Sequence, residues 1–187
     1  CSAKPNLLDG SWPLKYAIGN GMRPDVWERF VKRYNVANVV EFYAATEGNT
    51  NLFNNTGKVG AIGVVPWWAK TIYPIRLVQC DATTSELVRV PGKGTCIECK
   101  PGEVGQIVGL IKDSDPMRRF DGYTDKKATA KKIARDVMHR GDTYFLSGDL
   151  VKQDSWGFFY WHDRIGDTFR WKGENVSTAE VAGILSK

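Results

Sequence analysis

The stretch DRIGDTFRWKGENVST, residues 163–178, is the most informative part of this chain. It places six charged residues, two glycines and two large aromatic residues in one short segment. Arginine and lysine side chains bind anions, and glycine permits backbone conformations that a side chain forbids. This combination predicts a segment that contacts a phosphate-bearing ligand, moves, or does both.

Two polar turns upstream extend this prediction. Thr46-Glu47-Gly48 follows an apolar run, residues 36–43, that reads as a buried strand, and Ser147-Gly148-Asp149 precedes the quoted stretch. Ligands bind where strands of an open α/β sheet end, and a carboxylate there can hold Mg²⁺. The alternative is a solvated turn in each place. For Asp149 taken alone, a turn that caps its own backbone is the favoured interpretation.

Length and charge restrict the possible classes of protein. With 187 residues, 42% hydrophobic, the chain is one large domain or a domain plus part of another. A net charge of +5 favours anionic partners such as nucleotides, coenzyme A, nucleic acid or anionic membrane surfaces. No stretch approaches the ~20 apolar residues of a membrane span. Because the chain starts at Cys1 and stops at Lys187, we expect an internal fragment of a longer protein.

The cysteine pattern argues against a structural metal site. Cys96 and Cys99 form one C-x-x-C pair, while His139 and His162 are isolated in sequence. A structural zinc site needs two such pairs, or a pair with histidines. We therefore expect reduced thiols in a reducing compartment.

Hydrophobic periodicity predicts a mixed fold. We expect an α/β (α+β mix) class, with a helix at 24–34 beside the strand at 36–43. Strand-like runs separated by Gly, Pro and Asp then suggest an antiparallel sheet or small barrel. The further elements are strands at 72–80, 86–90 and 106–111, a helix at 126–138, a hairpin of 144–151 with 157–163, and a helix from residue 177.

A cluster of aromatic and basic residues allows two interpretations. Trp67 and Trp68 precede Lys70, Tyr73 and Arg76. The cluster could be a membrane-interface patch, but the favoured prediction is a barrel core with a basic rim.

The order of these motifs resembles the adenylate-forming superfamily. The motifs are Y-x-x-T-E-G at 43–48, S-G-D at 147–149 and the long stretch from Asp163, here followed by T-x-E-V. Within that superfamily the sequence is similar to the fatty acid transport protein / very long-chain acyl-CoA synthetase family. The likeness runs from about Leu14 onward and includes residues 17–27, 58–63, 73–78 and 119–123.

The resemblance implies an architecture and a reaction. Residues 1–56 would end the α/β lobe of an AMP-binding domain, 57–165 would form its β-rich, barrel-like subdomain, and 166–187 would be the hinge and the start of a C-terminal lid domain. The reaction would join a fatty acid to coenzyme A through an acyl-adenylate, using ATP and Mg²⁺. A lid would rotate between the two half-reactions.

The resemblance also assigns roles to residues. Tyr43 would lie against adenine, Asp149 would bind the ribose hydroxyls with help from Arg164, and Gly48 would belong to the same nucleotide-binding turn. Catalytic roles would fall to Thr46 at the α-phosphate, Glu47 at magnesium, Arg164, and Lys172 in the lid loop with Gly173. The hinge would include Gly166 and Asp167, and residues 19–21 would line the acyl or nucleotide pocket.

Departures from the family pattern limit what the fragment is expected to do. Its phosphate loop and late lid lysine are not in this sequence, so we expect no complete reaction from the fragment alone. Many relatives carry Asp or Lys where Gly166 stands, so the hinge is assigned to within one residue. The parent is expected at intracellular membranes (endoplasmic reticulum, peroxisome or plasma membrane), associated peripherally or by an anchor, with this domain facing the cytosol.

Three other functions stay open at this point. One is an adenylate-forming ligase for a bile, aryl or amino acid, and another is a non-catalytic lipid-uptake or membrane-surface protein that keeps the fold. Nucleic-acid binding is the weakest, because the sequence has no aromatic-basic strand motif of the RNA-binding type, and we expect no nucleic-acid partner.

Overall fold

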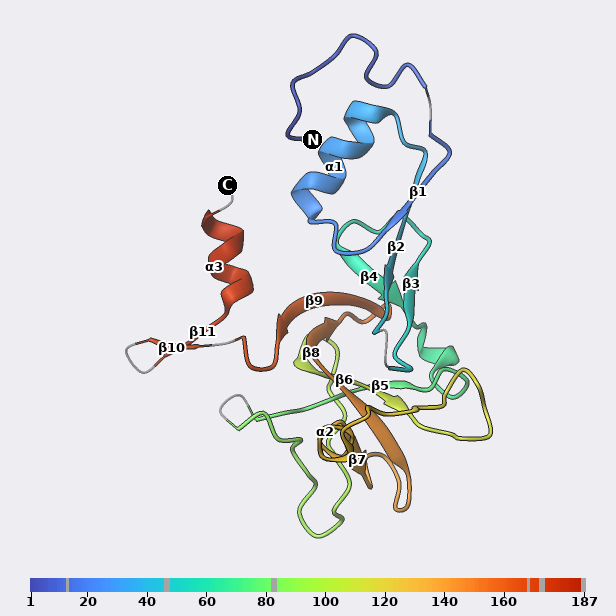
Figure 1. Cartoon of the computed structure of the whole chain (residues 1–187), viewed down its shortest axis with the longest axis vertical. Helices are drawn as coiled ribbons and strands as arrows, with labels where there is room; N and C mark the ends of the chain where they lie inside the picture. The colour runs from blue at the N-terminus through green and yellow to red at the C-terminus, as the bar shows by residue number, and fades with distance from the viewer. Residues whose placement is uncertain (13, 46–47, 82–83, 168, 172–173, 186–187) are drawn as a thin grey trace.

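The computed structural model describes all residues except 13, 46–47, 82–83, 168, 172–173 and 186–187. The described part consists of two larger β-sheets that meet edge to face, one helix packed on the smaller sheet, and an arm at the C-terminus (Figure 1). Strands predominate over helices among the described residues. The predicted α/β (α+β mix) class is therefore corrected: the described part of the chain is mostly β.

The smaller sheet has the order β1-β2-β3, with β1 (Tyr16–Gly19) parallel and β3 (Leu52–Asn54) antiparallel to β2 (Asn38–Tyr43). Helix α1 (Pro24–Tyr34) covers one face and buries Trp27 against the sheet. Proline at its first turn and a left-handed residue at its C-cap explain its bounds. The helix predicted at 24–34 is thus confirmed.

The larger sheet is antiparallel and curls into a half-barrel (Figure 1). Its order is β4-β9-β8-β6-β5, and β7 pairs with residues 143–145 at the start of β8. The bounds are β4 (Ala61–Val64), β5 (Ile75–Val78), β6 (Val104–Leu110), β7 (Ile133–Arg135), β8 (Thr143–Gln153) and β9 (Phe158–Arg164). The predicted antiparallel subdomain and the hairpin of β8 and β9 agree with this arrangement.

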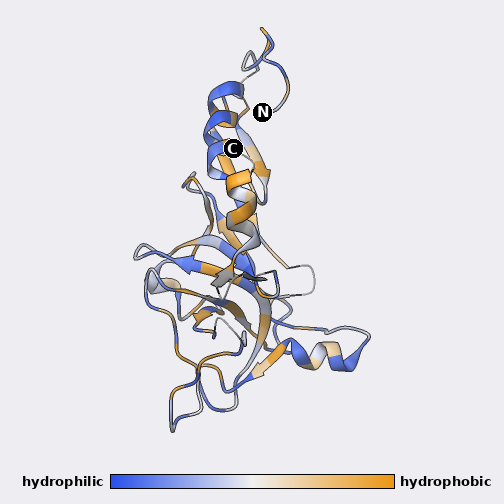
Figure 2. Cartoon of the chain, turned by 90° about the vertical axis from the view of Figure 1, so that its left-hand side faces the viewer, coloured by the Kyte–Doolittle hydropathy of each residue, from blue (hydrophilic) through white to orange (hydrophobic). Residues whose placement is uncertain are grey.

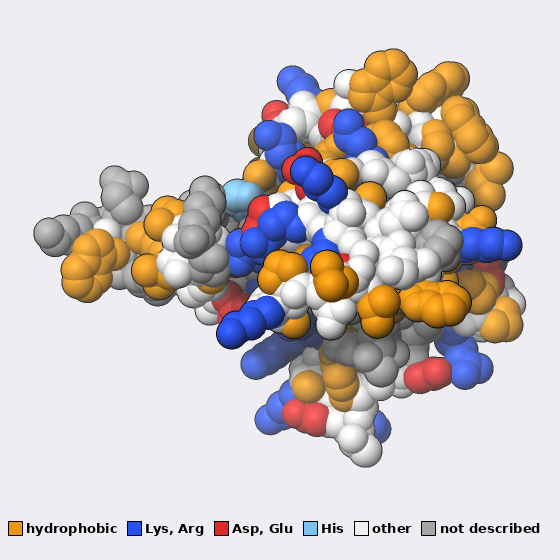
Figure 3. All heavy atoms as spheres, turned by 90° about the horizontal axis from the view of Figure 1, so that it is seen from above, with side chains coloured by type: hydrophobic (Ala, Val, Ile, Leu, Met, Phe, Trp, Pro, Cys, Tyr) orange, Lys and Arg blue, Asp and Glu red, His pale blue; other side chains and the backbone are white. Residues whose placement is uncertain are grey.

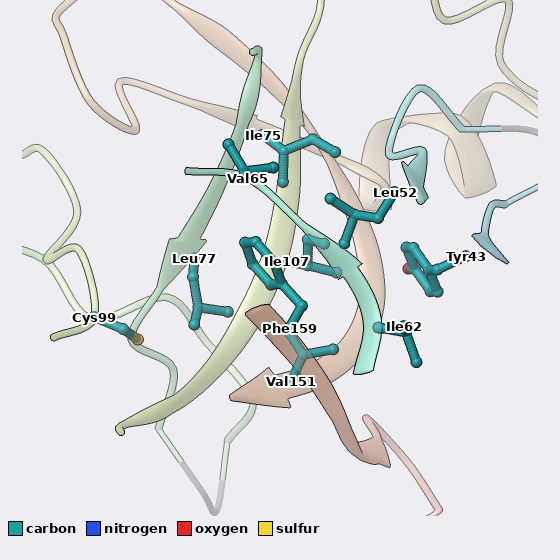
Figure 4. Close-up of a cluster of buried hydrophobic side chains, with 10 residues drawn as sticks. All are labelled: Tyr43, Leu52, Ile62, Val65, Ile75, Leu77, Cys99, Ile107, Val151 and Phe159. Carbon is teal, nitrogen blue, oxygen red and sulfur yellow. The ribbon is translucent and has the colours of Figure 1, made fainter. Parts of the chain in front are cut away.

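The two sheets meet where β4 crosses β3. A Cβ atom on Gly63 would come within 2.4 Å of Leu52 Cβ, so only glycine allows this close crossing. Figure 4 shows the hydrophobic core at this junction, in which Tyr43 and Leu52 of the smaller sheet lie beside Ile62 of β4. The junction therefore brings the end of β2 against the half-barrel.

The C-terminal arm contains β10 (Phe169–Trp171), β11 (Glu174–Val176) and α3 (Thr178–Leu185). Figure 3 shows it projecting from the body with apolar side chains on its surface, and Figure 2 shows that α3 is largely apolar whereas α1 and α2 are largely hydrophilic. None of the described helices has the length and apolar content needed to cross a membrane.

Three local predictions were wrong. The helix expected at 126–138 ends early, as α2 (Lys126–Lys131), because the next residues pair with β8 and bury Ala134. Residues 86–90 make only isolated bridges. Trp67 and Trp68, in a 3-10 turn η1 (Trp67–Ala69), are 78% and 63% exposed, so they are not core residues.

Three of the four thiols lie in this sheet region, and all four are free. Cys96 and Cys99 are buried, and Cys80 is half-buried. Burial, and then the charge of Glu103, raises the pKa of Cys99 to about 12, so this thiol stays protonated and unreactive at neutral pH.

Candidate active site

A cavity of about 510 Å³ opens where the end of β2 meets β8 and β9. Its size is typical of sites for small molecules. The residues around it come from both sheets and from the loop after β1: Asn20, Gly21, Phe42, Tyr43, Ala44, Ala45, Ile62, Ser147, Asp149, Trp161 and Arg164.

Asp149 enters this cavity because β8 is deformed just before it. Gly148 has φ +84°, which favours glycine. The Ser147 hydroxyl donates to the Ile107 carbonyl at 2.7 Å and accepts from the Asp149 N–H at 3.0 Å, and the Ile165 N–H donates to the Gly148 carbonyl at 2.8 Å. Residues 147–149, which the sequence predicted as a turn, therefore form a bent segment inside β8, and this segment is fixed on both sides.

One carboxylate oxygen of Asp149 is occupied by Tyr43. The Tyr43 hydroxyl donates to Asp149 Oδ2 at 2.6 Å in a buried setting, although the two residues are distant in sequence. Burial, and then the hydrogen bond to Asp149, raises the pKa of Tyr43 far above its ordinary value. The phenol is therefore a permanent donor that orients the carboxylate.

The other oxygen, Asp149 Oδ1, is buried and accepts no hydrogen bond. Arg164 stands opposite Asp149 in the strand register, with Nε 3.5 Å from Oδ1. The Arg164 side chain is 57% exposed, so this ion pair contributes less than ~1 kcal/mol. Since buried acceptors are normally paired, Oδ1 is an acceptor ready for a ligand donor.

Glu41 in β2 is a buried acid that bonds to Gly21, one of the residues that line the cavity. Its Oε1 accepts from the backbone N–H groups of Gly21 and Met22, the latter at 3.1 Å, and Oε2 is buried without a hydrogen bond. Burial raises the pKa of Glu41, against the effect of the two N–H donors. The carboxyl therefore ties the Asn20–Gly21 loop to β2.

Gly48 packs directly against an aromatic side chain of the half-barrel. A Cβ atom at Gly48 would come within 2.3 Å of Phe145, whose ring is fully buried and lies 4.9 Å from the ring of Phe120. The next residue, Asn49, donates to the carbonyls of Leu110 and Arg118 at 2.8 and 3.0 Å. The loop after β2 is thus anchored from two directions.

The structure brings together Tyr43, Asp149 and Arg164, with Gly48 anchored nearby. Gly166 and Asp167 follow Arg164 in a turn, in which the Asp167 N–H donates to the Arg164 carbonyl at 3.1 Å. The predicted residues Thr46, Glu47, Lys172 and Gly173 lie outside the described residues. Within the described ranges no three His, Cys, Asp or Glu side chains gather as a metal site would need.

Sequence reasoning missed Glu41 and Phe145, and it named Ser147 in the S-G-D motif without predicting its hydrogen bonds. Glu41 could have been found, because burying an acid in the middle of an apolar strand is costly. Phe145 gave no such signal, and neither did the bond from Ser147 to Ile107, since these contacts join segments distant in sequence.

Comparisons with known proteins find extensive sequence similarity to fatty acid transport proteins. No family model matches the chain. The chain is 50% identical over 174 residues to long-chain fatty acid transport protein 1 of Homo sapiens, covering 93% of the chain and 27% of that protein. It is 49% identical over 179 residues to the Bos taurus protein (96% and 28%), and 44% identical over 182 residues to human long-chain fatty acid transport protein 3 (97% and 26%). The chain thus spans about a quarter of the length of these curated relatives.

Solved structures share the fold at low sequence identity. ATP-bound MatB from Rhodopseudomonas palustris aligns with TM-score 0.63 and 22% identity, covering 91% of this chain and 29% of that one. O-succinylbenzoate coenzyme A synthetase from Bacillus subtilis, in complex with ATP and magnesium, aligns with TM-score 0.59 and 20% identity (91% and 31%). These similarities establish the fold alone: this chain has the fold of the matching segment of those two structures.

Proposed function

Because the chain belongs, over the segment that it spans, to the long-chain fatty acid transport protein family, we propose that the full-length protein is an ATP-dependent ligase joining long or very long fatty acids to coenzyme A, linked to fatty acid uptake. The observation that supports this most directly is Asp149 Oδ1, a buried acceptor without a hydrogen bond at a cavity of nucleotide size. A ribose hydroxyl supplies the missing donor.

The reaction proposed has two steps. A carboxylate oxygen of the fatty acid attacks the α-phosphorus of ATP while the bond to pyrophosphate breaks. The coenzyme A thiol then releases its proton to solvent while its sulfur attacks the acyl carbon, and AMP leaves with the electron pair of the broken acyl–oxygen bond. Magnesium, when bound, neutralises phosphate charge, and Glu47 is the residue that we propose to hold it, with Thr46 at the α-phosphate.

The described residues support the nucleotide half of this proposal. Asp149 accepts from a ribose hydroxyl, Tyr43 holds that carboxylate in place and presents its ring to the base, and Arg164 adds positive charge at the cavity mouth. Gly166, exposed and with φ +94°, begins a turn that can absorb a change of backbone direction. We propose it, with Asp167, as the hinge of a lid to which Lys172 and Gly173 belong.

The function is tested by assaying the full-length protein with ATP, coenzyme A and a series of long and very long fatty acids. We expect acyl-CoA and AMP to form in equal amounts. Activation of an aryl, bile or amino acid in preference to every fatty acid would contradict the assigned substrate. A folded protein that forms no acyl-adenylate at all would favour a non-catalytic lipid-uptake role.

We further propose that the parent protein works at a membrane surface, as its substrate class suggests. The proposed contact is a tryptophan surface made of Trp67, Trp68 and Trp156. The Val65 N–H donates to the Gly157 carbonyl at 2.9 Å, and this bond holds the segment before η1 beside the β8–β9 turn that carries Trp156. Trp156 is 79% exposed. Lys58 flanks this surface, with Nζ 5.9 Å from the centroid of the Phe158 ring. Tryptophan favours the boundary between lipid and water.

Replacing all three tryptophans of this surface with serine is expected to weaken binding of the full-length protein to phosphatidylcholine vesicles at least about tenfold, since each large apolar side chain contributes ~1 kcal/mol or more when buried. Co-sedimentation measures the change. Trp12→Ser, at a site 80% exposed elsewhere on the chain, is the matched control. Equal binding of wild type and triple variant would mean that this surface is covered by another part of the protein.

A further inference from the structure

Lys132, just after α2, contacts the bent segment of β8 at residues 147–149 and lines a groove separate from the candidate site. Its Nζ donates to the Ser147 carbonyl at 3.1 Å. A Cβ atom on Gly148 would lie 3.3 Å from the same nitrogen, so the ammonium group also sits directly against the backbone of the next residue. Lys132 therefore reaches the two residues that precede the carboxylate.

The backbone of Lys132 is fixed independently of its side chain. The Leu146 N–H donates to the Lys132 carbonyl at 2.8 Å, in line with the pairing of β7 to β8. The lysine thus starts from a rigid position, and its half-buried stem runs along a separate groove of about 850 Å³ on the back of the sheet. An ammonium held in this way contributes a charge-assisted hydrogen bond, which is stronger than a neutral one.

The same ammonium group lies 6.0 Å from the centroid of the Phe145 ring, within the range of a cation–π contact. Phe145 in turn supports Gly48. One lysine therefore contacts two segments near the candidate site: residues 147–149 of β8 directly, and the loop at Gly48 through Phe145.

We propose that Lys132 is a positioning residue for ATP, acting by holding the Ser147-Gly148-Asp149 segment of β8 so that Asp149 Oδ1 meets a ribose hydroxyl. This inference rests on the proposed function. Its cause is geometric: Gly148, with its positive φ, has the most adaptable backbone of this segment, and the Lys132 ammonium group holds the carbonyl just before it. Without the ammonium group, the carboxylate would still be present but less accurately placed.

The test compares kcat/KM of the full-length enzyme for ATP, 2′-deoxy-ATP and 3′-deoxy-ATP. We expect Lys132→Met to lower kcat/KM for ATP about tenfold, which corresponds to one hydrogen bond to a charged group. The deoxy analogue that the wild type uses less well should lose far less, so the preference for the ribose hydroxyl shrinks. Lys132→Arg should restore most of that preference, because arginine keeps the charge and the donor.

Two control variants distinguish a failure of the Lys132 inference from a failure of the proposed ribose role of Asp149. Lys131→Met removes the same charge from the exposed neighbouring position in α2 and should leave the preference unchanged. Asp149→Ala should abolish it. If Lys132→Met lowers kcat/KM for all three nucleotides equally while Asp149→Ala abolishes the preference, Lys132 is only structural and the inference is overturned, but the function stands. If Asp149→Ala keeps the preference, the proposed ribose role of Asp149 is itself wrong.

Discussion

Replacing Asp149 with alanine is expected to lower kcat/KM for ATP about 10- to 100-fold in the full-length enzyme, because a hydrogen bond to a charged group contributes ~1.5–3 kcal/mol. The structure gives the reason in atomic terms. Asp149 Oδ1 is buried at the cavity with no hydrogen bond, so a ribose hydroxyl that fills this place displaces no hydrogen bond of the folded protein. Measurement of kcat and KM for ATP at saturating fatty acid and coenzyme A detects the loss.

The same substitution also leaves the buried Tyr43 hydroxyl without its acceptor, and this could lower activity through folding alone. Tyr43→Phe is the matched control, because it breaks the same 2.6 Å hydrogen bond but keeps both the carboxylate and the aromatic ring. We expect Tyr43→Phe to lose much less kcat/KM for ATP than Asp149→Ala does. Equal losses in the two variants would show that the bond between them, rather than contact with ribose, matters.

The half of the site that could be predicted from sequence is the half carried by local motifs. Asp149 and Arg164 stand opposite each other in the register of β8 and β9, and the hairpin itself was visible in the sequence because a turn separates two alternating runs. Tyr43 could be placed at a strand end from its apolar run alone. That its hydroxyl meets Asp149 could not be predicted, because the contact depends on how two sheets cross at Gly63.

The remaining differences also come from tertiary contacts. Residues 133–135 have helical periodicity with the preceding lysines, yet they form β7, since backbone pairing with β8 and burial of Ala134 outweigh a helix preference of a few tenths of a kcal/mol per residue. The cluster of aromatic and basic residues that includes Trp67 and Trp68 predicted a barrel core with a basic rim. Both tryptophan side chains are exposed, because they lie in a turn outside the strands, where the alternation of buried and exposed positions does not apply.

Gly48→Ala is expected to reduce kcat at least about tenfold and to destabilise the protein by ~1–3 kcal/mol, the usual range for overpacking a rigid site. The added methyl group would come within 2.3 Å of Phe145, whose ring is fully buried and held by Phe120 on one side and Lys132 on another. Because the ring cannot move away, the backbone at residue 48 must shift, and Thr46 and Glu47 immediately precede it in the chain. The nucleotide-binding turn should therefore suffer more than the core.

A second substitution distinguishes this cause from a general loss of stability. Phe145→Leu makes room at the point of contact, so the double variant Gly48→Ala/Phe145→Leu should recover part of the kcat lost by Gly48→Ala, although Phe145→Leu alone lowers stability. Gly183→Ala, where an added Cβ has no neighbour within 4 Å, controls for the glycine-to-alanine change itself. If the two substitutions simply add, in kcat and in the free energy of unfolding, the contact between Gly48 and Phe145 does not set the position of the turn. A double variant more active than Gly48→Ala would instead show that the contact between Gly48 and Phe145 sets the position of Thr46 and Glu47. These are the residues that we propose to meet the α-phosphate and magnesium.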